Sequence, residues 1–363
     1  MYSLIKPILF KLDPEQAHNY TFAISKLVQK MPALLSALET LYRYNSPRLV
    51  QKVLGITYSN PIGLAAGFDK NVEIPYLLQS LGFGFLEFGS ITALPSNGNA
   101  KPRLFRLAED QALINRLGLN NKGVDALLKP ISELDLSIPF AINITKTHSP
   151  DILGDDGIND IVNSFIKLYP FGLYHVINVS CPNTKEGKTF ESATAVSKLL
   201  GRISTERKKI GIDKPLFIKF SADIELSELQ ACLLVCDSYG VDGYIISNTS
   251  TKRTNLLTDQ AKLDSIGKGG LSGKPLLENS LKLVSFIWQR FEGRKPIIGL
   301  GGISSAEDAI AMMQAGASLV QLYTGLVYQG PGVIKKIVKG MDEYCQREKI
   351  NSISEIIGTK LCQ

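Results

Sequence analysis

The sequence predicts an α/β fold, a (β/α)8 TIM barrel that follows an N-terminal α-helical, membrane-associating appendage. Two observations predict the barrel: short apolar strand-like segments alternate with helix-like segments from about residue 53 onward, and eight such strands occur. Alternation of this kind is typical of a parallel sheet with helices outside, and eight repeats favour closure over an open sheet. A third observation sets the start of the chain apart, because the first fifty residues show helical spacing and no convincing strand.

The appendage is expected to contain three short helices. Large apolar side chains recur at helical intervals over Leu4–Leu9 and Ala17–Leu27, and the Asp13–Glu15 segment is typical of an N-cap followed by proline in the first turn. Pro32 opens a third helix that ends near Tyr42. We expect residues 1–45 to form the appendage and residues 46–363 to form the barrel.

Two interpretations of the appendage are open. It is a helical lid packed on the barrel, or it is an amphipathic hairpin whose outer apolar face enters a bilayer surface. In the second case Lys6, Lys11, Lys26 and Lys30 would lie near the lipid headgroups.

The eight barrel strands are predicted from apolar runs that end in polar or glycine residues: Ile62–Ala66, Phe85–Gly89, Phe140–Ile144, His175–Asn178, Leu216–Lys219, Gly243–Ser247, Ile297–Gly301 and Leu319–Tyr323. Helical periodicity lies between them, over Ile158–Leu168, Ala193–Lys208, Ser227–Tyr239, Leu276–Phe291, Ala306–Ala315 and Gly332–Tyr344. The connection from Gly89 to Phe140 is too long for one helix and should carry an insertion over the barrel mouth.

Composition excludes several classes of protein. Hydrophobic residues at 44% and charged residues at 20% indicate an ordinary folded chain, not a disordered, collagenous or coiled-coil one. The net charge of +6 favours acidic ligands or anionic lipid and does not require nucleic acid, so no nucleic-acid partner is expected. Five cysteines without a CxxC pair indicate free thiols in a reducing compartment. The first residues lack the pattern of a secretory or organellar signal, and glycines interrupt the longest charge-free run, Ala309–Ile334, so we expect cytosolic synthesis in a bacterium and no transmembrane helix.

Active sites of this architecture lie at the carboxyl ends of the strands. There the glycine segments Gly299–Ser305 and Leu319–Gly332 favour a phosphorylated ligand, although tight turns also use such glycines. The three histidines, His18, His148 and His175, have no spacing for a metal cluster or a catalytic triad.

Other side chains at the strand ends narrow the chemistry. Asp69 and Glu87 have no clear paired partner in the sequence, so hydrolytic chemistry is not favoured. The segment Asn178–Thr184 instead places Cys181 between two asparagines after a strand, where the thiol could act as a base or nucleophile on a planar polar substrate or could be a buried structural thiol. Asparagine amides suit the imide and amide edges of a pyrimidine ring, and lysine supplies charge for a carboxylate or a flavin.

Nearly the whole chain resembles the dihydroorotate dehydrogenases, and specifically their membrane-associated, quinone-dependent class 2. The resemblance lies in long motifs that occur in order, namely FKLDPEQAH, NPIGLAAGFDKN, KPRLFRL, INRLGLNNKGVD, NVSCPNT, LFIKFSAD, SNTS, GGLSGKPL, PIIGLGGISS and GASLVQLYTGLVYQGPG. The class 2 assignment rests on the appendage and on KPRLFRL, which soluble class 1 enzymes lack.

The resemblance implies FMN at the barrel mouth and no metal. The residues expected to bind it are Ala65, Ala66, Gly67, Ser90, Asn143, Asn178, Lys219, Ser247, Gly273, Gly302, Tyr323 and Thr324. Dihydroorotate is expected to contact Lys70, Asn115, Arg116, Leu117, Gly118, Leu119, Asn178, Asn183, Asn248 and Thr249. The quinone is expected to enter beneath the appendage near His18, Arg106 and Tyr323, although His18 alone could equally be a surface or capping residue.

The implied reaction belongs to pyrimidine (UMP) biosynthesis. Cys181 would take a proton from C5 of (S)-dihydroorotate while a hydride passes from C6 to FMN, and the electrons then reach a membrane quinone. Lys219 is expected to balance the charge of the reduced flavin. The resemblance also implies a peripheral location on the cytoplasmic side of the bacterial inner membrane.

Two positions depart from the class 2 pattern. Class 2 enzymes typically carry serine where this chain has Cys181, and the family usually carries phenylalanine where it has Leu119, so we expect a looser loop there.

Three alternatives to the quinone-dependent enzyme remain open. They are a soluble class 1-like enzyme that uses fumarate or NAD, which only Cys181 suggests, a Schiff-base aldolase with Lys219 as its amine, and a lipid-binding barrel without chemistry.

Overall fold

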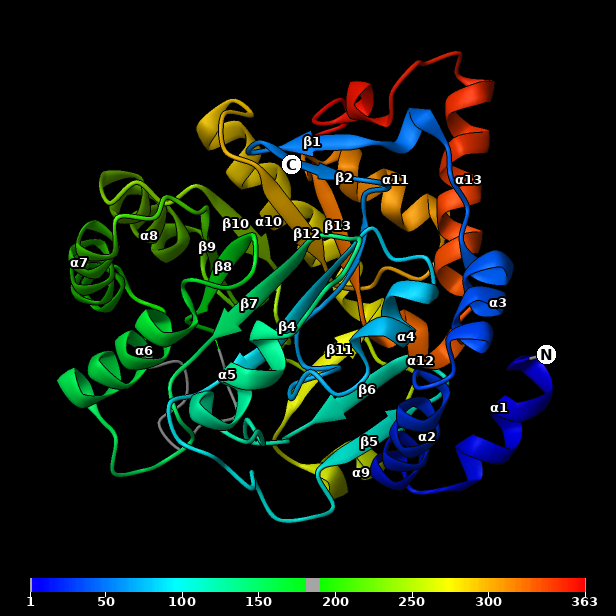
Figure 1. Cartoon of the computed structure of the whole chain (residues 1–363), viewed down its shortest axis with the longest axis horizontal. Coiled ribbons are helices and arrows are strands. Elements are labelled where there is room, and N and C mark those ends of the chain that lie inside the picture. Colours follow the sequence, from blue (N-terminus) through cyan, green and yellow to red (C-terminus); the bar gives the residue numbers. More distant parts are fainter. Residues whose placement is uncertain (1, 181–189, 363) are drawn as a thin grey trace.

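The computed structural model describes residues 2–180 and 190–362, and within them eight parallel strands close into a barrel (Figure 1). The strands are β3 (Ile62–Leu64), β4 (Phe85–Ile91), β7 (Phe140–Ile144), β8 (Tyr174–Asn178), β9 (Leu216–Lys219), β10 (Gly243–Ile246), β12 (Ile297–Leu300) and β13 (Leu319–Leu322). All eight were expected from the sequence, and their ends differ from the expected ones by at most two residues. Neighbours in the barrel are neighbours in the chain, and β13 closes it against β3.

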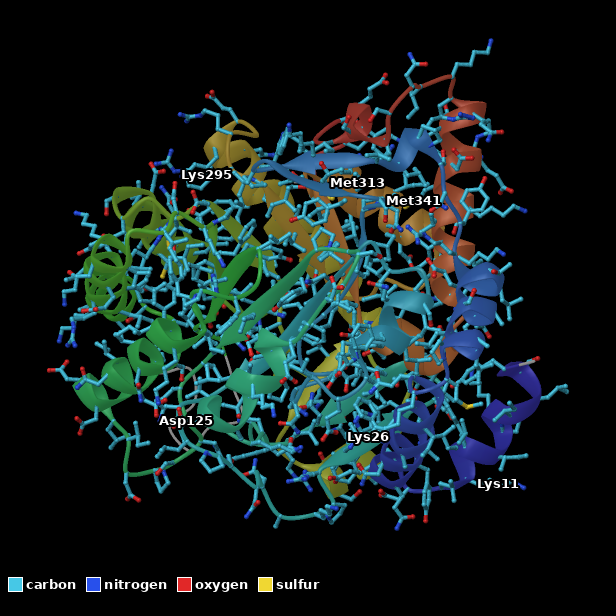
Figure 2. All side chains as sticks on the ribbon, viewed as in Figure 1. Lys11, Lys26, Asp125, Lys295, Met313 and Met341 are labelled. Atoms are coloured by element: carbon cyan, nitrogen blue, oxygen red, sulfur yellow. The ribbon has the colours of Figure 1, made fainter. Side chains whose placement is uncertain are left out.

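Helices surround the barrel, and six of them lie where the periodicity predicted: α6 (Gly154–Leu168), α7 (Ala193–Ile210), α8 (Leu226–Ser238), α10 (Leu277–Phe291), α11 (Ala306–Gln314) and α13 (Val333–Arg347). Three short helices were not predicted: α4 (Pro75–Ser80), α9 (Gln260–Ile266) and α12 (Thr324–Gln329). Apolar faces of neighbouring helices meet between them; Met313 of α11 and Met341 of α13, for example, are fully buried (Figure 2). A 3-10 turn, Lys274–Leu276, precedes α10 where the sequence analysis had begun that helix.

A hairpin that the sequence analysis missed closes the amino end of the barrel. Its strands are β1 (Gln51–Val53) and β2 (Ile56–Tyr58), and both residues of the connecting turn, Leu54 and Gly55, have positive φ. Positive φ at both positions is typical of a two-residue β-hairpin turn, but such turns usually contain asparagine or glycine at the position that Leu54 occupies here. The hairpin places Tyr58 against Phe85 inside the barrel.

The insertion expected between Gly89 and Phe140 is present at the opposite, carboxyl end. It contains β5 (Leu104–Leu107), β6 (Ala112–Asn115) and α5 (Val124–Ser132). The two strands join β11 (Gly270–Gly273) in an antiparallel sheet over the mouth (Figure 1).

The appendage consists of α1 (Tyr2–Lys11), α2 (Pro14–Val28) and α3 (Pro32–Tyr42), as predicted. Asp13 caps α2, because its carboxylate accepts hydrogen bonds from the backbone N–H groups of Glu15 and Gln16 at 3.0 Å each. α2 lies beside β5 at the mouth, whereas α3 packs against α4 on the side of the barrel (Figure 1). The division of the chain after residue 45 stays a prediction.

The outer side of the appendage is apolar. Its large exposed side chains are Leu4, Ile5, Ile8, Tyr20, Ile24, Leu27, Met31, Leu34 and Leu41. Among the helices of the described residues, none is long and apolar enough to cross a bilayer.

The lysines of the appendage differ in their surroundings. Lys11 lies at the end of α1 on the outside of the molecule (Figure 2), but Lys26 forms an ion pair of 2.7 Å with Glu73 of the barrel. The ammonium of Lys6 lies over the rings of Phe10 and Tyr328.

Candidate active site

The carboxyl ends of the strands and the mouth sheet enclose a cavity of about 160 Å³, here called the mouth cavity. Most of the residues proposed from the sequence to bind cofactor or substrate line it: Ala65, Ala66, Gly67, Lys70, Ser90, Asn115, Leu117, Gly118, Leu119, Asn178, Lys219, Ser247, Asn248, Thr249, Gly273, Gly302, Tyr323 and Thr324. They come from segments far apart in the chain, and closure of the barrel brings them together.

Of the four remaining proposed residues, the structure describes two, Asn143 and Arg116, and neither lines the cavity. Cys181 and Asn183 lie outside the described residues. Asn143 lies behind the cavity wall, where its side chain contacts Ser90 and Glu87. Arg116 supports the wall from outside, because its guanidinium donates to the backbone carbonyls of Pro102, Ile266 and Lys268.

A buried ion pair lies beneath the cavity, and it corrects the expectation that Glu87 lacks a partner. Nζ of Lys219 lies 3.3 Å from Oε1 of Glu87, and both side chains are almost completely buried. Asn143 and Gln321 each donate a side-chain hydrogen bond of 2.6 Å to the same carboxylate. A buried charge is costly unless it is paired and hydrogen-bonded, and here all these partners are supplied.

A chain of hydrogen bonds orients the polar wall of the cavity. Asn178 donates from Nδ2 to the hydroxyl of Ser90 at 3.2 Å, and its Oδ1 accepts from the hydroxyl of Ser180 at 2.8 Å. Asn248 donates to that serine hydroxyl at 3.0 Å. The amides are therefore held before any ligand binds, which reduces the cost of ordering them.

Lys70 is a cationic side chain of the cavity, and its charge interacts with that of Glu15 in the appendage. Burial lowers the pKa of its ammonium to about 8; Arg103 lowers it further, whereas Glu15 and Asp69 oppose this change. Asp69 is held by the backbone N–H groups of Glu73 and Ile74 at 2.8 Å each.

Several glycines also line the cavity. Gly67 and Gly302 have φ of +102° and +82°, which side chains rarely adopt. A Cβ at Gly302 would also lie 2.6 Å from that of Leu277, so packing as well as ligand access requires glycine there.

Sequence reasoning missed several lining residues, including Gln111, Ser272, Lys274, Ser304 and Gln321. Gln321 lies in the strand β13, one residue before its end, and alternation along that strand could have indicated that it faces inward. Its Oε1 is buried and has no hydrogen-bond partner among the described residues. A hydrogen-bond donor of a ligand in the cavity would satisfy that oxygen.

A second cavity of about 320 Å³, the appendage cavity, lies beneath α1–α3. It is lined mainly by apolar side chains and by the three residues proposed for the quinone, His18, Arg106 and Tyr323. Tyr323 also lines the mouth cavity, as do Leu104 and Leu113. The two cavities are thus separated by a wall of shared side chains.

The polar groups of the appendage cavity are held in place. His18 packs against the rings of Phe22 and Phe68, with centroids at 4.3 and 5.8 Å, so it is neither a simple surface residue nor a cap. Burial lowers its pKa to about 4, which leaves it neutral at neutral pH. Arg106 donates to the carbonyls of Phe10 and Leu12 and stacks on the Phe10 ring.

Comparison with known proteins gives the family. The family model described as dihydroorotate dehydrogenase matches residues 48–345. The chain belongs to the dihydroorotate dehydrogenase family. It is 39% identical to "Dihydroorotate dehydrogenase (quinone)" of Natronomonas pharaonis, over 99% of each chain, and 37% identical to the protein of the same name from Trichodesmium erythraeum, over 98% of this chain and 97% of that one.

A solved structure of the same family has the same fold. The ligand-free DHODH of Eimeria tenella superposes with a TM-score of 0.86 at 32% identity, covering 96% of this chain and 99% of that one. The matched relatives extend over the appendage as well as the barrel, which favours the quinone class over the class 1-like and aldolase alternatives.

Proposed function

We propose that the chain oxidises (S)-dihydroorotate to orotate in pyrimidine biosynthesis and delivers the electrons to a quinone. It is an oxidoreductase of the dihydroorotate dehydrogenase (quinone) type. The observation that carries the proposal is the pair of cavities that share Tyr323, Leu104 and Leu113: the one at the strand ends brings lysine, asparagine and hydroxyl side chains together, and the one under the appendage is lined mainly by apolar side chains. Two substrates of opposite polarity would each have a site.

The mouth cavity suits FMN. The amide of Asn178, the ammonium of Lys219 and the hydroxyls of Ser90 and Ser247 match the polar edge of a flavin ring, and the unsatisfied Oε1 of Gln321 offers an acceptor. The phosphate end would lie among Gly273, Gly302, Tyr323 and Thr324. When bound, FMN would supply the hydride-accepting and electron-passing chemistry that side chains lack. Asn143 would act from behind, by orienting Ser90.

Dihydroorotate would bind over the same cavity. The Lys70 ammonium would pair with its carboxylate, and Asn115, Asn178 and Asn248 would hydrogen-bond the ring amides. Arg116 to Leu119 and Thr249 would shape the remaining wall, with Asn183 as a further contact. Cys181 is proposed as the base that removes the C5 proton.

The quinone would enter the appendage cavity from a membrane. Exposed apolar side chains on all three helices of the appendage would enter the bilayer surface, so that a lipid-soluble acceptor reaches His18, Arg106 and Tyr323 without crossing water. The location would be peripheral, on the cytoplasmic face of the bacterial inner membrane, with residues 1–45 as the membrane-facing unit and 46–363 as the FMN-binding barrel.

The absorbance spectrum from 300 to 550 nm of the purified chain tests the whole proposal. An oxidised-flavin spectrum should bleach on anaerobic addition of dihydroorotate and return on addition of a short-chain quinone. If the oxidised-flavin spectrum returns with fumarate or NAD but not with quinone, the proposal that quinone is the electron acceptor is contradicted. A colourless protein that FMN does not reconstitute would contradict the cofactor.

A further inference from the structure

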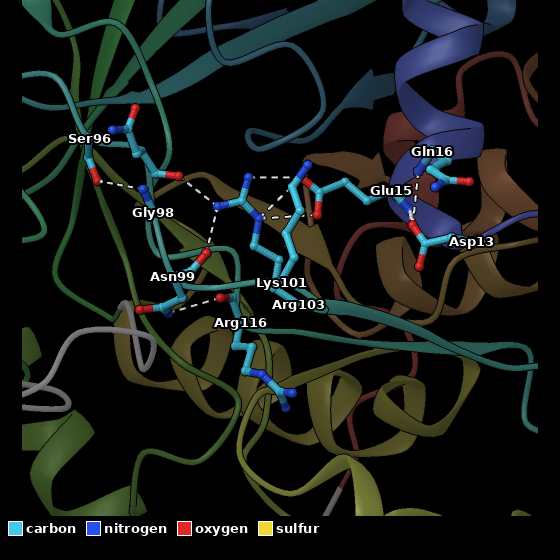
Figure 3. A network of polar contacts seen from close by, with 10 residues as sticks. Asp13, Glu15, Gln16, Ser96, Gly98, Asn99, Lys101, Arg103 and Arg116 are labelled. Carbon is cyan, nitrogen blue, oxygen red and sulfur yellow. Dashed lines mark hydrogen bonds and ion pairs between the residues drawn. The ribbon is translucent and has the colours of Figure 1, made fainter.

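The appendage is joined to the barrel mouth by a buried ion pair between Glu15 of α2 and Arg103, just before β5 (Figure 3). Nη2 of Arg103 lies 2.8 Å from Oε1 of Glu15, and Nε donates to both carboxylate oxygens at 3.1 and 3.2 Å. The side chains are only 8% and 12% exposed, whereas Lys101, 3.5 Å from Glu15, is 63% exposed. A two-pronged, desolvated contact of this kind fixes geometry as well as charge.

The other side of the same guanidinium organises the segment 97–103. Nη1 of Arg103 donates to the backbone carbonyls of Asn97 and Asn99 at 2.6 and 2.9 Å, so the segment curves around it (Figure 3). Gly98 is packed so tightly there that a Cβ would lie 2.0 Å from the carbonyl oxygen of Leu117. Arg103 is therefore the centre of this turn.

The segment is hydrogen-bonded to residues 115–119, here called the substrate loop. Asn99 donates from its backbone N–H to the carbonyl of Leu117 at 3.1 Å and from Nδ2 to that of Arg116 at 2.9 Å. Ser96 donates to the carbonyl of Gly118 at 3.3 Å. Leu117 and Gly118 line the mouth cavity.

The ion pair lines neither cavity, but it lies near one lining residue of each. Glu15 lies one helical turn from His18, which lines the appendage cavity, and the two residues are on one face of α2. Both charges also act on Lys70, which lines the mouth cavity: Arg103 lowers the pKa of its ammonium, and Glu15 raises it.

We propose that Glu15 is a positioning residue for the substrate: through Arg103 it holds the 97–103 segment against the substrate loop, so the appendage completes the dihydroorotate site as well as the quinone site. This inference rests on the proposed function, since it takes dihydroorotate and orotate as the ligands of the mouth cavity. It separates two roles of the appendage, which are attachment to the barrel and organisation of the site.

Lys26 provides the matched control, because it also joins α2 to the barrel. It pairs with Glu73 at 2.7 Å, but Lys26 is 44% exposed and has no part in the contacts of Arg103 with the 97–103 segment. Lys26→Gln removes the ion pair with Glu73, whereas Glu15→Gln removes the buried pair with Arg103 and the exposed pair with Lys101.

The test is the dissociation constant of orotate, measured with the full-length holoenzyme from the change in the flavin spectrum, together with the KM for dihydroorotate. Glu15→Gln should raise both roughly fivefold, within the range of couplings carried by contact networks, while Lys26→Gln leaves both within about twofold of wild type. Equal effects of the two variants, or an unchanged orotate affinity in Glu15→Gln, would overturn the inference.

A second variant keeps the test independent of partial unfolding. Arg103→Gln should weaken orotate binding. Adding Glu15→Gln to it should raise the dissociation constant of orotate only slightly further, because both substitutions break the same contact between Glu15 and Arg103. Fully additive losses would refute the relay. Failure of wild-type protein to bind orotate at all would instead refute the proposed function.

Discussion

Glu87 and Lys219 form a buried ion pair under the mouth cavity, although 132 residues separate them in the chain. The carboxylate also accepts from Asn143 and Gln321, so four strands of the barrel meet at one charged group. The lysine proposed to lie near the flavin is thus part of a neutral pair and not an isolated positive charge.

Breaking the ion pair between Glu87 and Lys219 should destabilise the folded chain. Glu87→Gln should lower the free energy of unfolding by about 3–5 kcal/mol, because it leaves the Lys219 charge buried and unpaired. Denaturant unfolding measures this. Adding Lys219→Met should recover much of the loss, and a double variant that is less stable than Glu87→Gln would contradict the explanation.

Lys70 should make orotate binding depend on pH. Its pKa is lowered to about 8, mainly by burial, so the ammonium carries its charge below pH 8 and loses it above, while the ligand carboxylate stays ionised throughout. The dissociation constant should therefore rise above pH 8, by up to about tenfold per pH unit. Lys70→Arg stays charged and is the control; the same rise in that variant would assign the titration to another group.

Cys181 should set the pH dependence of flavin reduction by dihydroorotate. A thiol has an unperturbed pKa of about 8.5, far below that of an alcohol, so the rate should level off at lower pH in wild type than in Cys181→Ser. Stopped-flow reduction across pH 6 to 10 gives the two profiles. Cys362→Ser, at a half-buried thiol near the C-terminus, should follow wild type. Coincident profiles of wild type and Cys181→Ser would exclude Cys181 as the titrating base.

His18 should make the fold less stable in mild acid. Its pKa in the folded chain is about 4, lowered chiefly by burial and also by Lys70, against about 6.5 unfolded, so the unfolded chain binds more protons between these values. Stability is thus complete above pH 6.5 and falls as the pH drops towards 4, by up to about 3 kcal/mol from this residue.

His18→Gln should flatten the dependence of Tm on pH in that window without removing it. The buried His175, with a pKa lowered by burial to about 3, acts in the same direction and remains in the variant. An unchanged slope in His18→Gln would show that His18 is not buried as a neutral ring.

The outer face of the appendage should bind vesicles. Leu4→Ser with Ile8→Ser should weaken co-sedimentation with mixed zwitterionic and anionic vesicles at least about tenfold, since each apolar side chain contributes about 1.5–3 kcal/mol when it leaves water. Leu257→Ser is the matched control, because Leu257 on the barrel is 74% exposed and Leu4 is 76% exposed. Equal loss in the control would argue against a specific membrane face.

The order of strands and helices was predictable because it depends on local patterns. Apolar runs with polar ends located all eight barrel strands, and helical spacing with the Asp13 cap located the three helices of the appendage. The β1–β2 hairpin escaped because Leu54 occupies a turn position that usually signals itself by glycine or asparagine.

The fold class, the family resemblance and the set of polar residues that follow the strands could all be predicted, since they depend on residue type and spacing along the chain. Which of those residues contact one another depends on how the chain folds in three dimensions. Glu87 forms an ion pair with Lys219, and Glu15 forms one with Arg103. Arg116 instead donates hydrogen bonds to backbone carbonyls outside the cavity. These contacts join residues that lie as far as 152 positions apart in the chain, and they depend on the closure of the barrel and on the direction of each side chain, which no local pattern encodes.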